Sequence, residues 1–175
     1  MKGPERFETA RLVLRRPCAA DAEAIFARYA SDPAVTPYLA WPTHGSVEDT
    51  RTFLAWSDAE WAQWPAGPYL IERRGGGLAG STGLAFEAPD VAATGYVLAR
   101  DAWGRGYATE ALGAMVGLAV ELGVRRLYAL CHAENRASAR VLEKCGFRLE
   151  GRFAESGGFP NLPPGLVHGC LRYGR

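Results

Sequence analysis

Residues 95–112 read Gly95-Tyr96-Val97-Leu98-Ala99-Arg100-Asp101-Ala102-Trp103-Gly104-Arg105-Gly106-Tyr107-Ala108-Thr109-Glu110-Ala111-Leu112. This pattern predicts a strand, a loop that contains glycines, and the beginning of a helix. Glycines at such a junction allow backbone N–H groups to converge on an anion, and the first turn of the helix adds partial positive charge. The stretch therefore favours a phosphate or pyrophosphate site, and the alternative is a plain tight turn into a helix.

Two common nucleotide-binding motifs are absent from the sequence. The P-loop pattern Gly-x-x-x-x-Gly-Lys-Ser/Thr does not occur, which excludes a P-loop nucleotidase. A dinucleotide fingerprint that started at Gly104 would need Gly or Ala at position 109, where this chain has Thr109. An anion site in this loop would therefore be neither a P-loop nor a dinucleotide-binding site.

On both sides of this stretch, short apolar strands alternate with helical segments. We expect strands at residues 11–16, 69–73, 78–86, 92–99, 126–132, 147–153 and 166–173. We expect helices at residues 20–31, 46–64, 105–122 and 135–145. Gly75-Gly76-Gly77 marks a hairpin, Gly123 and Gly146 follow two of the helices, and Ser46 with Asp49 matches a capping box. The order of elements predicts an α/β fold.

Length and charge narrow the class of protein. The chain has 175 residues, which fits one domain, and its 48% hydrophobic and 22% charged residues are ordinary globular usage. With 20 basic and 19 acidic residues the net charge is +1, so we expect no direct DNA binding.

The sequence also bears on location and metal binding. The N-terminal residues carry no secretory signal, and the longest uncharged helix-like run, Ala111–Val120, is 10 residues, against about 20 for a membrane span. The four cysteines contain no Cys-x-x-Cys pair. We therefore expect a cytoplasmic protein with reduced thiols, no metal site and no contact with a membrane.

A second motif changes the interpretation of the first. Residues 135–147 read Asn135-Arg136-Ala137-Ser138-Ala139-Arg140-Val141-Leu142-Glu143-Lys144-Cys145-Gly146-Phe147. Together with the loop at 103–108, this motif resembles the GNAT superfamily of acetyl-CoA-dependent N-acetyltransferases, in the RimJ/RimL-like branch that acetylates ribosomal-protein N-termini. Residues 9–15, Thr9-Ala10-Arg11-Leu12-Val13-Leu14-Arg15, resemble the first strand of that branch. The resemblance covers about residues 9–173.

The resemblance implies an α/β (α+β) GNAT fold formed by residues 1–175 as a single domain. In this fold a twisted, mixed and mostly antiparallel sheet of about six to seven strands is flanked by about four helices. The sheet is splayed between strands 4 and 5, which correspond here to residues 92–99 and 126–132. A homodimer is an open alternative to a monomer.

The resemblance also implies acetyl-CoA as co-substrate, with no metal. A backbone N–H near Val97 or Leu98 would polarise the thioester carbonyl, and Asn135 and Ser138 would contact the pantetheine arm. The pyrophosphate would lie on the backbone of the loop, formed by Trp103, Gly104, Arg105, Gly106, Tyr107, Ala108 and Thr109.

Two positions depart from the family pattern and affect the catalytic residues. Many relatives have a tyrosine general acid where this chain has Leu142, which leaves Ser138, on the same helix face as Asn135, as the nearest hydroxyl. The branch often has a glutamate where this chain has Ala93. The candidate general bases that remain are Glu87, His132 and Glu155.

Several features keep two readings. The basic stripe Arg136, Arg140 and Lys144 is either a solvated helix face or a contact to the 3′-phosphate of coenzyme A. The aromatic residues of the 46–64 helix form either core or a wall of the acceptor site. His132 is either structural or a base, and residues 156–165 could form one lip of the acceptor cleft.

The resemblance predicts transfer of acetyl to a primary amine, in the first place the α-amine of a protein or peptide N-terminus. A small-molecule amine such as an amino acid, polyamine or aminoglycoside is the alternative acceptor. A non-catalytic acyl-CoA-binding module is the alternative function, because the family's tyrosine and glutamate are both missing.

Overall fold

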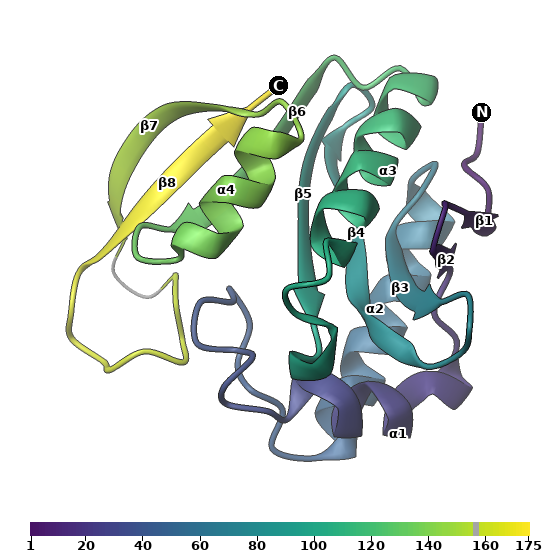
Figure 1. The fold of residues 1–175 in the computed structure, drawn as a ribbon, viewed down its shortest axis with the longest axis horizontal. Helices are drawn as coiled ribbons and strands as arrows, with labels where there is room; N and C mark the ends of the chain where they lie inside the picture. Colours follow the sequence, from purple (N-terminus) through teal and green to yellow (C-terminus); the bar gives the residue numbers. More distant parts are fainter. Residues whose placement is uncertain (156–157) are drawn as a thin grey trace.

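The computed structural model describes residues 1–155 and 158–175, without the side chain of Glu155. Within these residues, eight strands form one sheet in the order β1-β2-β3-β4-β5-β6-β8-β7 (Figure 1). The strands are β1 (Arg6–Glu8), β2 (Leu12–Arg15), β3 (Pro68–Arg73), β4 (Leu78–Ala88), β5 (Val91–Leu98), β6 (Arg126–His132), β7 (Arg148–Glu155) and β8 (His168–Gly174). All neighbouring pairs are antiparallel except β5 and β6, which are parallel.

The sheet has one strand more than the six to seven expected. The additional strand, β1, has three residues and pairs with β2 through Phe7↔Leu14. Its sequence Arg6-Phe7-Glu8 is too short to show the alternation of a strand, so only the pairing with β2 defines it.

In the described part of the chain four α-helices accompany the sheet, as expected. They are α1 (Ala22–Ile25), α2 (Val47–Gln63), α3 (Tyr107–Glu121) and α4 (Arg136–Lys144). The helix expected over residues 20–31 is present but is not uniform, because a 3₁₀ turn (Ala19–Asp21) precedes α1 and a π-helical turn (Phe26–Ala30) follows it. The expected ends are confirmed: the carboxylate of Asp49 accepts the N–H of Ser46 at 3.1 Å, and Gly123 and Gly146 have φ of 79° and 83°.

The sheet separates two layers of helix (Figure 1). On one face α3 and α4 bury side chains such as Leu112 and Leu142 against Leu84 and Ala92, and on the other face α1 and α2 bury Ile25 and Leu54. Successive residues of β5 point to opposite faces, so Leu98 belongs to the first core and Val97 to the second.

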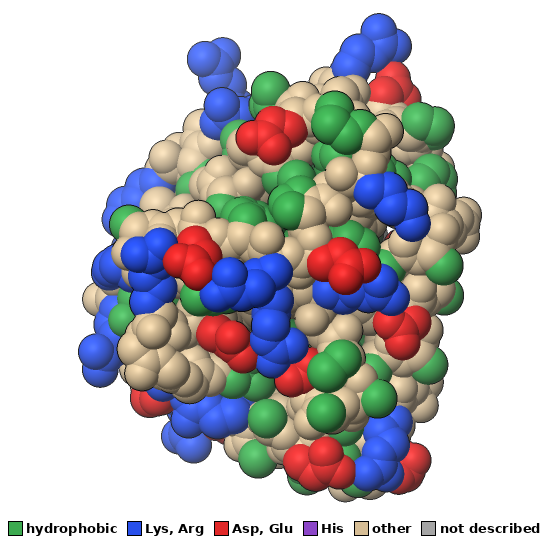
Figure 2. Space-filling view, turned by 90° about the vertical axis from the view of Figure 1, so that its right-hand side faces the viewer, with side chains coloured by type: hydrophobic (Ala, Val, Ile, Leu, Met, Phe, Trp, Pro, Cys, Tyr) green, Lys and Arg blue, Asp and Glu red, His purple; other side chains and the backbone are tan. Residues whose placement is uncertain are grey.

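The surface at the β1–β2 edge carries interleaved charges (Figure 2). Arg16 pairs with Glu5 and Asp58, and Arg74 pairs with Glu8. This face is therefore not a basic patch. Among the described residues no helix has the length and apolar character that crossing a membrane would require.

The expected splay is confirmed at the centre of the sheet. Strands β5 and β6 pair only through Val91↔Arg126, Ala92↔Leu127 and Ala93↔Tyr128. Beyond this point β5 continues along β4, and β6 continues along β8 as far as His132↔Cys170. The facing backbone edges of β5 and β6 therefore line a gap that opens toward their carboxyl ends.

Glycine at position 80 allows the end of β5 to lie close to β4. A Cβ on Gly80 would lie 2.0 Å from the carbonyl oxygen of Val97, a distance that real Cβ atoms do not reach. At Gly95, on the same strand pair, a Cβ would meet no atom within 4 Å.

We expect Gly80→Ala to lower the free energy of unfolding by about 3 kcal/mol, because the added methyl must push β5 away from β4. For a chain of this size that corresponds to a fall in Tm of about 6–12 °C, measurable by calorimetry. Gly95→Ala is the matched control and should change Tm little. Equal effects of the two substitutions would contradict the close approach.

Candidate active site

The loop before α3 has the backbone geometry of an anion site. Gly104 and Gly106 have φ of 70° and 78°, in the left-handed region that favours glycine, and Gly106 is the N-cap of α3. The N–H of Glu110 makes the first bond of the helix, to the oxygen of Gly106 at 3.1 Å. The N–H groups of Tyr107, Ala108 and Thr109 therefore point out of the first turn, where an anion can accept them.

Residues from the start of the chain hold this loop in place. Arg11 donates from Nη1 to the oxygen of Arg105 at 2.8 Å and from Nε to Glu110 at 2.7 Å, and its guanidinium lies 4.8 Å from the centre of the Tyr107 ring. Glu110 also accepts Thr9 Oγ1 at 2.6 Å and the N–H of Arg11 at 2.7 Å. Burial raises the pKa of Glu110, but the hydrogen bonds from Thr9 and Arg11 outweigh it and leave the pKa lowered.

The sequence did not reveal this support for the loop. The sequence placed Thr9 and Arg11 only in a segment that resembles the first strand of the family, and it predicted no role for Glu110. The one available signal was an acidic residue in the first turn of a helix, which is also common without any partner.

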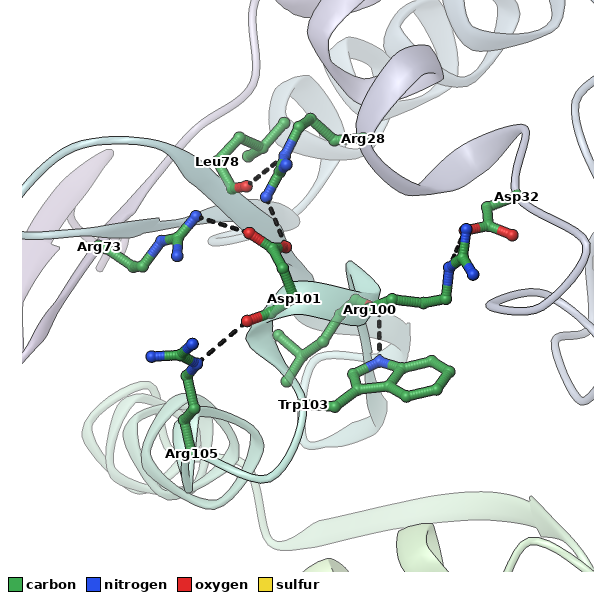
Figure 3. Close-up of polar contacts among 9 residues, drawn as sticks. Arg28, Asp32, Arg73, Leu78, Arg100, Asp101, Trp103 and Arg105 are labelled. Carbon is green, nitrogen blue, oxygen red and sulfur yellow. Dashed lines mark hydrogen bonds and ion pairs between the residues drawn. The ribbon is translucent and has the colours of Figure 1, made fainter.

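A second set of contacts fixes the turn between β5 and the loop (Figure 3). The carboxylate of Asp101 accepts from Arg28 at 2.7 Å and Arg73 at 3.2 Å, and the carbonyl of Asp101 accepts Arg105 Nε at 3.0 Å. The hydrogen bond from Arg28 is the main reason why the pKa of Asp101 is lowered. The indole of Trp103 donates to the oxygen of Leu98 at 2.8 Å. The end of β5 and the loop thus form one fixed unit.

The alternation of β5 distinguishes the two candidate N–H groups. Ala99 donates its N–H to Ala79 on the β4 side at 2.8 Å, so by alternation the N–H of Val97 also points to β4. The N–H and C=O groups of Leu98 therefore point the other way, into the gap, and the carbonyl of Leu98 accepts the indole N–H of Trp103 there. The geometry favours Leu98 over Val97 as the donor to a ligand in the gap.

Helix α4 places Asn135 and Ser138 beside the gap. Asn135 is the N-cap residue, and its Oδ1 accepts the N–H of Ser138 at 3.2 Å. The hydroxyl of Ser138 lies near the side chains of Tyr96 of β5 and Cys131 of β6, and burial raises the pKa of both residues, which keeps them protonated at neutral pH. Leu142 is 1% exposed and packs in the core. Ser138 is therefore the hydroxyl of α4 that lies near both parted strands.

Glu87 lies on the opposite face of the sheet. Its carboxylate accepts a hydrogen bond from the hydroxyl of Tyr128, the residue of β6 that pairs with Ala93 of β5. Because Glu87 belongs to β4, this contact crosses β5 next to Ala93, whose small side chain leaves room for it. The side chain thus reaches the base of the splay on the face not covered by α3 and α4.

His132 is enclosed and its ring nitrogens are engaged. The residue is 3% exposed, its Nδ1 accepts the N–H of Glu134 at 3.1 Å, and its Nε2 lies 3.4 Å from Nδ1 of His168. Burial is the main cause that lowers the pKa of His132, and a neutral ring with Nδ1 as acceptor carries its proton on Nε2. This arrangement favours a structural role. The side chain of Glu155, the third candidate base, lies outside the described residues.

The structure also bears on the basic stripe of α4, on the aromatic residues of α2 and on metal binding. Arg136, Arg140 and Lys144 are exposed, and within residues 1–155 and 158–175 none of them has a carboxylate within 4.0 Å. Of the α2 aromatics, Trp61 is core at 2% exposure, whereas Trp56 is 46% exposed. In the described part of the chain no group of three or more His, Cys, Asp or Glu side chains could hold a metal ion.

Comparison with known proteins agrees with this geometry. Residues 11–148 match the family model described as an acetyltransferase (GNAT) domain. The uncharacterized N-acetyltransferase YoaA of Bacillus subtilis (strain 168) is 34% identical over 148 residues, which are 82% of this chain and 83% of that protein.

Solved structures show the same likeness. The structure of an acetyltransferase (GNAT family) from Bacillus anthracis has a TM-score of 0.82 at 26% identity and covers 97% of both chains. RimL, a ribosomal L7/L12 alpha-N-protein acetyltransferase solved with coenzyme A, has a TM-score of 0.84 at 25% identity, over 98% of this chain and 97% of that chain.

The lowered pKa of Glu110 predicts how the stability of the protein depends on pH. A carboxyl whose pKa falls on folding stabilises the protein above its ordinary pKa of 4.5, and this contribution is lost as the pH drops through the folded value. We expect Glu110→Gln to cost about 2 kcal/mol at pH 7 in denaturant unfolding, and we expect the difference from wild type to shrink below about pH 4.5.

Glu121→Gln, at the exposed far end of α3, is the control and should stay within about 0.5 kcal/mol of wild type. A Glu110→Gln difference that does not depend on pH would show that the charge of Glu110 is not what stabilises the loop.

Proposed function

Because the chain belongs to the GNAT acetyltransferase family and is thus an N-acetyltransferase, we propose that its acceptor is the α-amine of a protein or peptide N-terminus. The likeness to RimL, at 25% identity over nearly the whole of both chains, supports this acceptor class. Acetyl-CoA is the donor in the proposal, because coenzyme A or acetyl-CoA occupies structures of two of its structural neighbours.

One observation supports acetyl-CoA as the donor: a helix N-terminus with two left-handed glycines lies next to a sheet whose central strands have parted. The N–H groups of Tyr107, Ala108 and Thr109 would bind the pyrophosphate. The exposed cations of α4 are available for a further phosphate. The gap between β5 and β6 would take the extended pantetheine arm, with Asn135 and Ser138 above it.

Acetyl-CoA supplies an activated acetyl group as a thioester. In the proposed mechanism the N–H of Leu98 hydrogen-bonds to the carbonyl oxygen, where negative charge develops. The acceptor amine attacks directly, so a C–N bond forms while the C–S bond breaks. The proton of the acceptor ammonium must leave before attack, and the thiolate that departs gains a proton or a hydrogen bond.

Glu87 is the proposed general base. It is a carboxylate on the face opposite α3 and α4, held by Tyr128 at the base of the splay. His132 is less suited, because the N–H of Glu134 already occupies its basic nitrogen. From Ala93 to Leu98 is about 17 Å along a strand, which is too far for one water, so in this proposal a chain of several waters carries the proton from the amine to Glu87.

A thiol-release assay with wild-type protein and acetyl-CoA tests the proposed function. We expect turnover with peptides that begin with Ser, Ala, Met or Thr, and slower turnover with free amino acids, polyamines and aminoglycosides. Preference for a free amine would replace the peptide acceptor with a small molecule. Binding of acetyl-CoA without thiol release on any amine would indicate a non-catalytic module.

Ser138→Ala should lower kcat by about tenfold to a hundredfold and leave the KM for acetyl-CoA nearly unchanged. The physical reason is that the hydroxyl would act on the departing sulfur, whose ordinary thiol pKa of about 8.5 already makes it a tolerable leaving group. Ser138→Thr keeps the hydroxyl and is the control. A raised KM with intact kcat would make Ser138 a ground-state contact to the cofactor instead.

A further inference from the structure

Two segments from distant parts of the chain meet across the carboxyl end of β6. One is the connection between α1 and α2, residues 32–46, and the other is residues 158–162, between β7 and β8. Figure 1 shows them side by side below the splay, and the hydrogen bonds between them confirm the contact. We call the two segments, with their contact, the clasp.

A single side chain makes the polar contacts of the clasp. Asn161 donates from Nδ2 to the oxygens of Thr36 at 2.7 Å and Trp41 at 2.9 Å. Its Oδ1 accepts the N–H of Thr43 at 2.7 Å and the hydroxyl of Thr43 at 3.0 Å. Both donors and both acceptor positions of the amide are used, and the partners fix which end is oxygen. Asn161 is therefore a complete cross-link between the segments.

The clasp also brings aromatic rings onto His132. Tyr38 stacks on the imidazole with centroids 4.6 Å apart and an interplanar angle of 22°, and Phe159 meets it edge-on at 4.7 Å. Phe159 is 8% exposed and Thr36 is fully buried, so the two segments are packed and not merely adjacent. Tyr38 is half-buried and no polar contact anchors its ring in the described structure.

The position of His132 shows which side of the gap the clasp borders. Cys131 points into the core beneath α4, so its neighbour His132 points to the other face. That is the face of Glu87 and Tyr128, opposite the helices that would hold the cofactor. The clasp therefore borders the gap on the face from which an acceptor amine would approach, if the cofactor lies on the face of α3 and α4.

We propose that Asn161 is a positioning residue that sets acceptor specificity by holding the clasp as a fixed wall of the acceptor entrance, with the Tyr38 ring as its contact surface. This inference rests on the proposed function. With the wall fixed in this way, we expect an extended peptide N-terminus to gain apolar contact from the Tyr38 ring, and we expect amines carried on bulky rings to be restricted. Preorganisation of this kind lowers the cost of ordering the acceptor in the site.

The test compares Asn161→Ala with wild type in the thiol-release assay, using an Ala-initiated peptide and an aminoglycoside as acceptors. We expect the KM for the peptide to rise about tenfold and the peptide-to-aminoglycoside ratio of kcat/KM to fall by a similar factor. The KM for acetyl-CoA and the Kd for coenzyme A should stay unchanged, which a general structural defect would not allow.

Further variants keep the inference testable if Asn161→Ala does not fold. Tyr38→Ala should reproduce the acceptor effect, and Tyr38→Phe, which keeps the ring, should lower the peptide-to-aminoglycoside ratio less than Tyr38→Ala does. Leu166→Ala, exposed and outside the clasp, is the loop control. Unchanged acceptor ratios in folded Asn161→Ala and Tyr38→Ala, with active wild type, would overturn the inference. Inactive wild type on every amine would instead overturn the proposed function.

Discussion

After Ala93 and Tyr128 the neighbouring strands β5 and β6 stop pairing, and the rest of the site depends on this separation. Backbone N–H and C=O groups that lose a partner are costly unless something else satisfies them, so a gap in the middle of a sheet needs support. Pairing on the far sides, β5 with β4 and β6 with β8, holds the two strands in place. The groups that face the gap need other partners, as the carbonyl of Leu98 finds in the indole of Trp103. The N–H of Leu98 faces away from β4, and in the proposed mechanism it donates to the ligand.

The proposed phosphate site is the loop beside the gap, and contacts from three parts of the chain hold this loop. Arg11 bonds the loop carbonyl at Arg105, and Arg28 and Arg73 meet Asp101 in the preceding turn. Exposed ion pairs of this kind contribute little stability one by one. Here they converge on a loop of a few residues, and what they determine is its position relative to β5.

The sequence predicted the features that depend on local pattern. Apolar periodicity and glycines gave seven of the eight strands, the four helices and their ends, and helical spacing brought Asn135 and Ser138 to one side of α4. Contacts across long separations were beyond such patterns. Glu110 meets Arg11 at a distance of 99 residues in the chain, and Asn161 meets Thr36 at 125. A single sequence contains no local signal for either pair, because each residue type is common on surfaces.

The two departures from the family pattern look different once the structure is considered. Leu142 fills core space under α4, and one turn earlier Ser138 lies near Tyr96 and Cys131 of the parted strands. Ala93 is small, and this allows the carboxylate of Glu87 to reach Tyr128 across β5. In the proposed mechanism the acid therefore comes from the preceding turn of the same helix, and the base comes from the neighbouring strand. A substitution at a motif position removes a side chain from the site, but the chemistry is lost only if no other element reaches the same space.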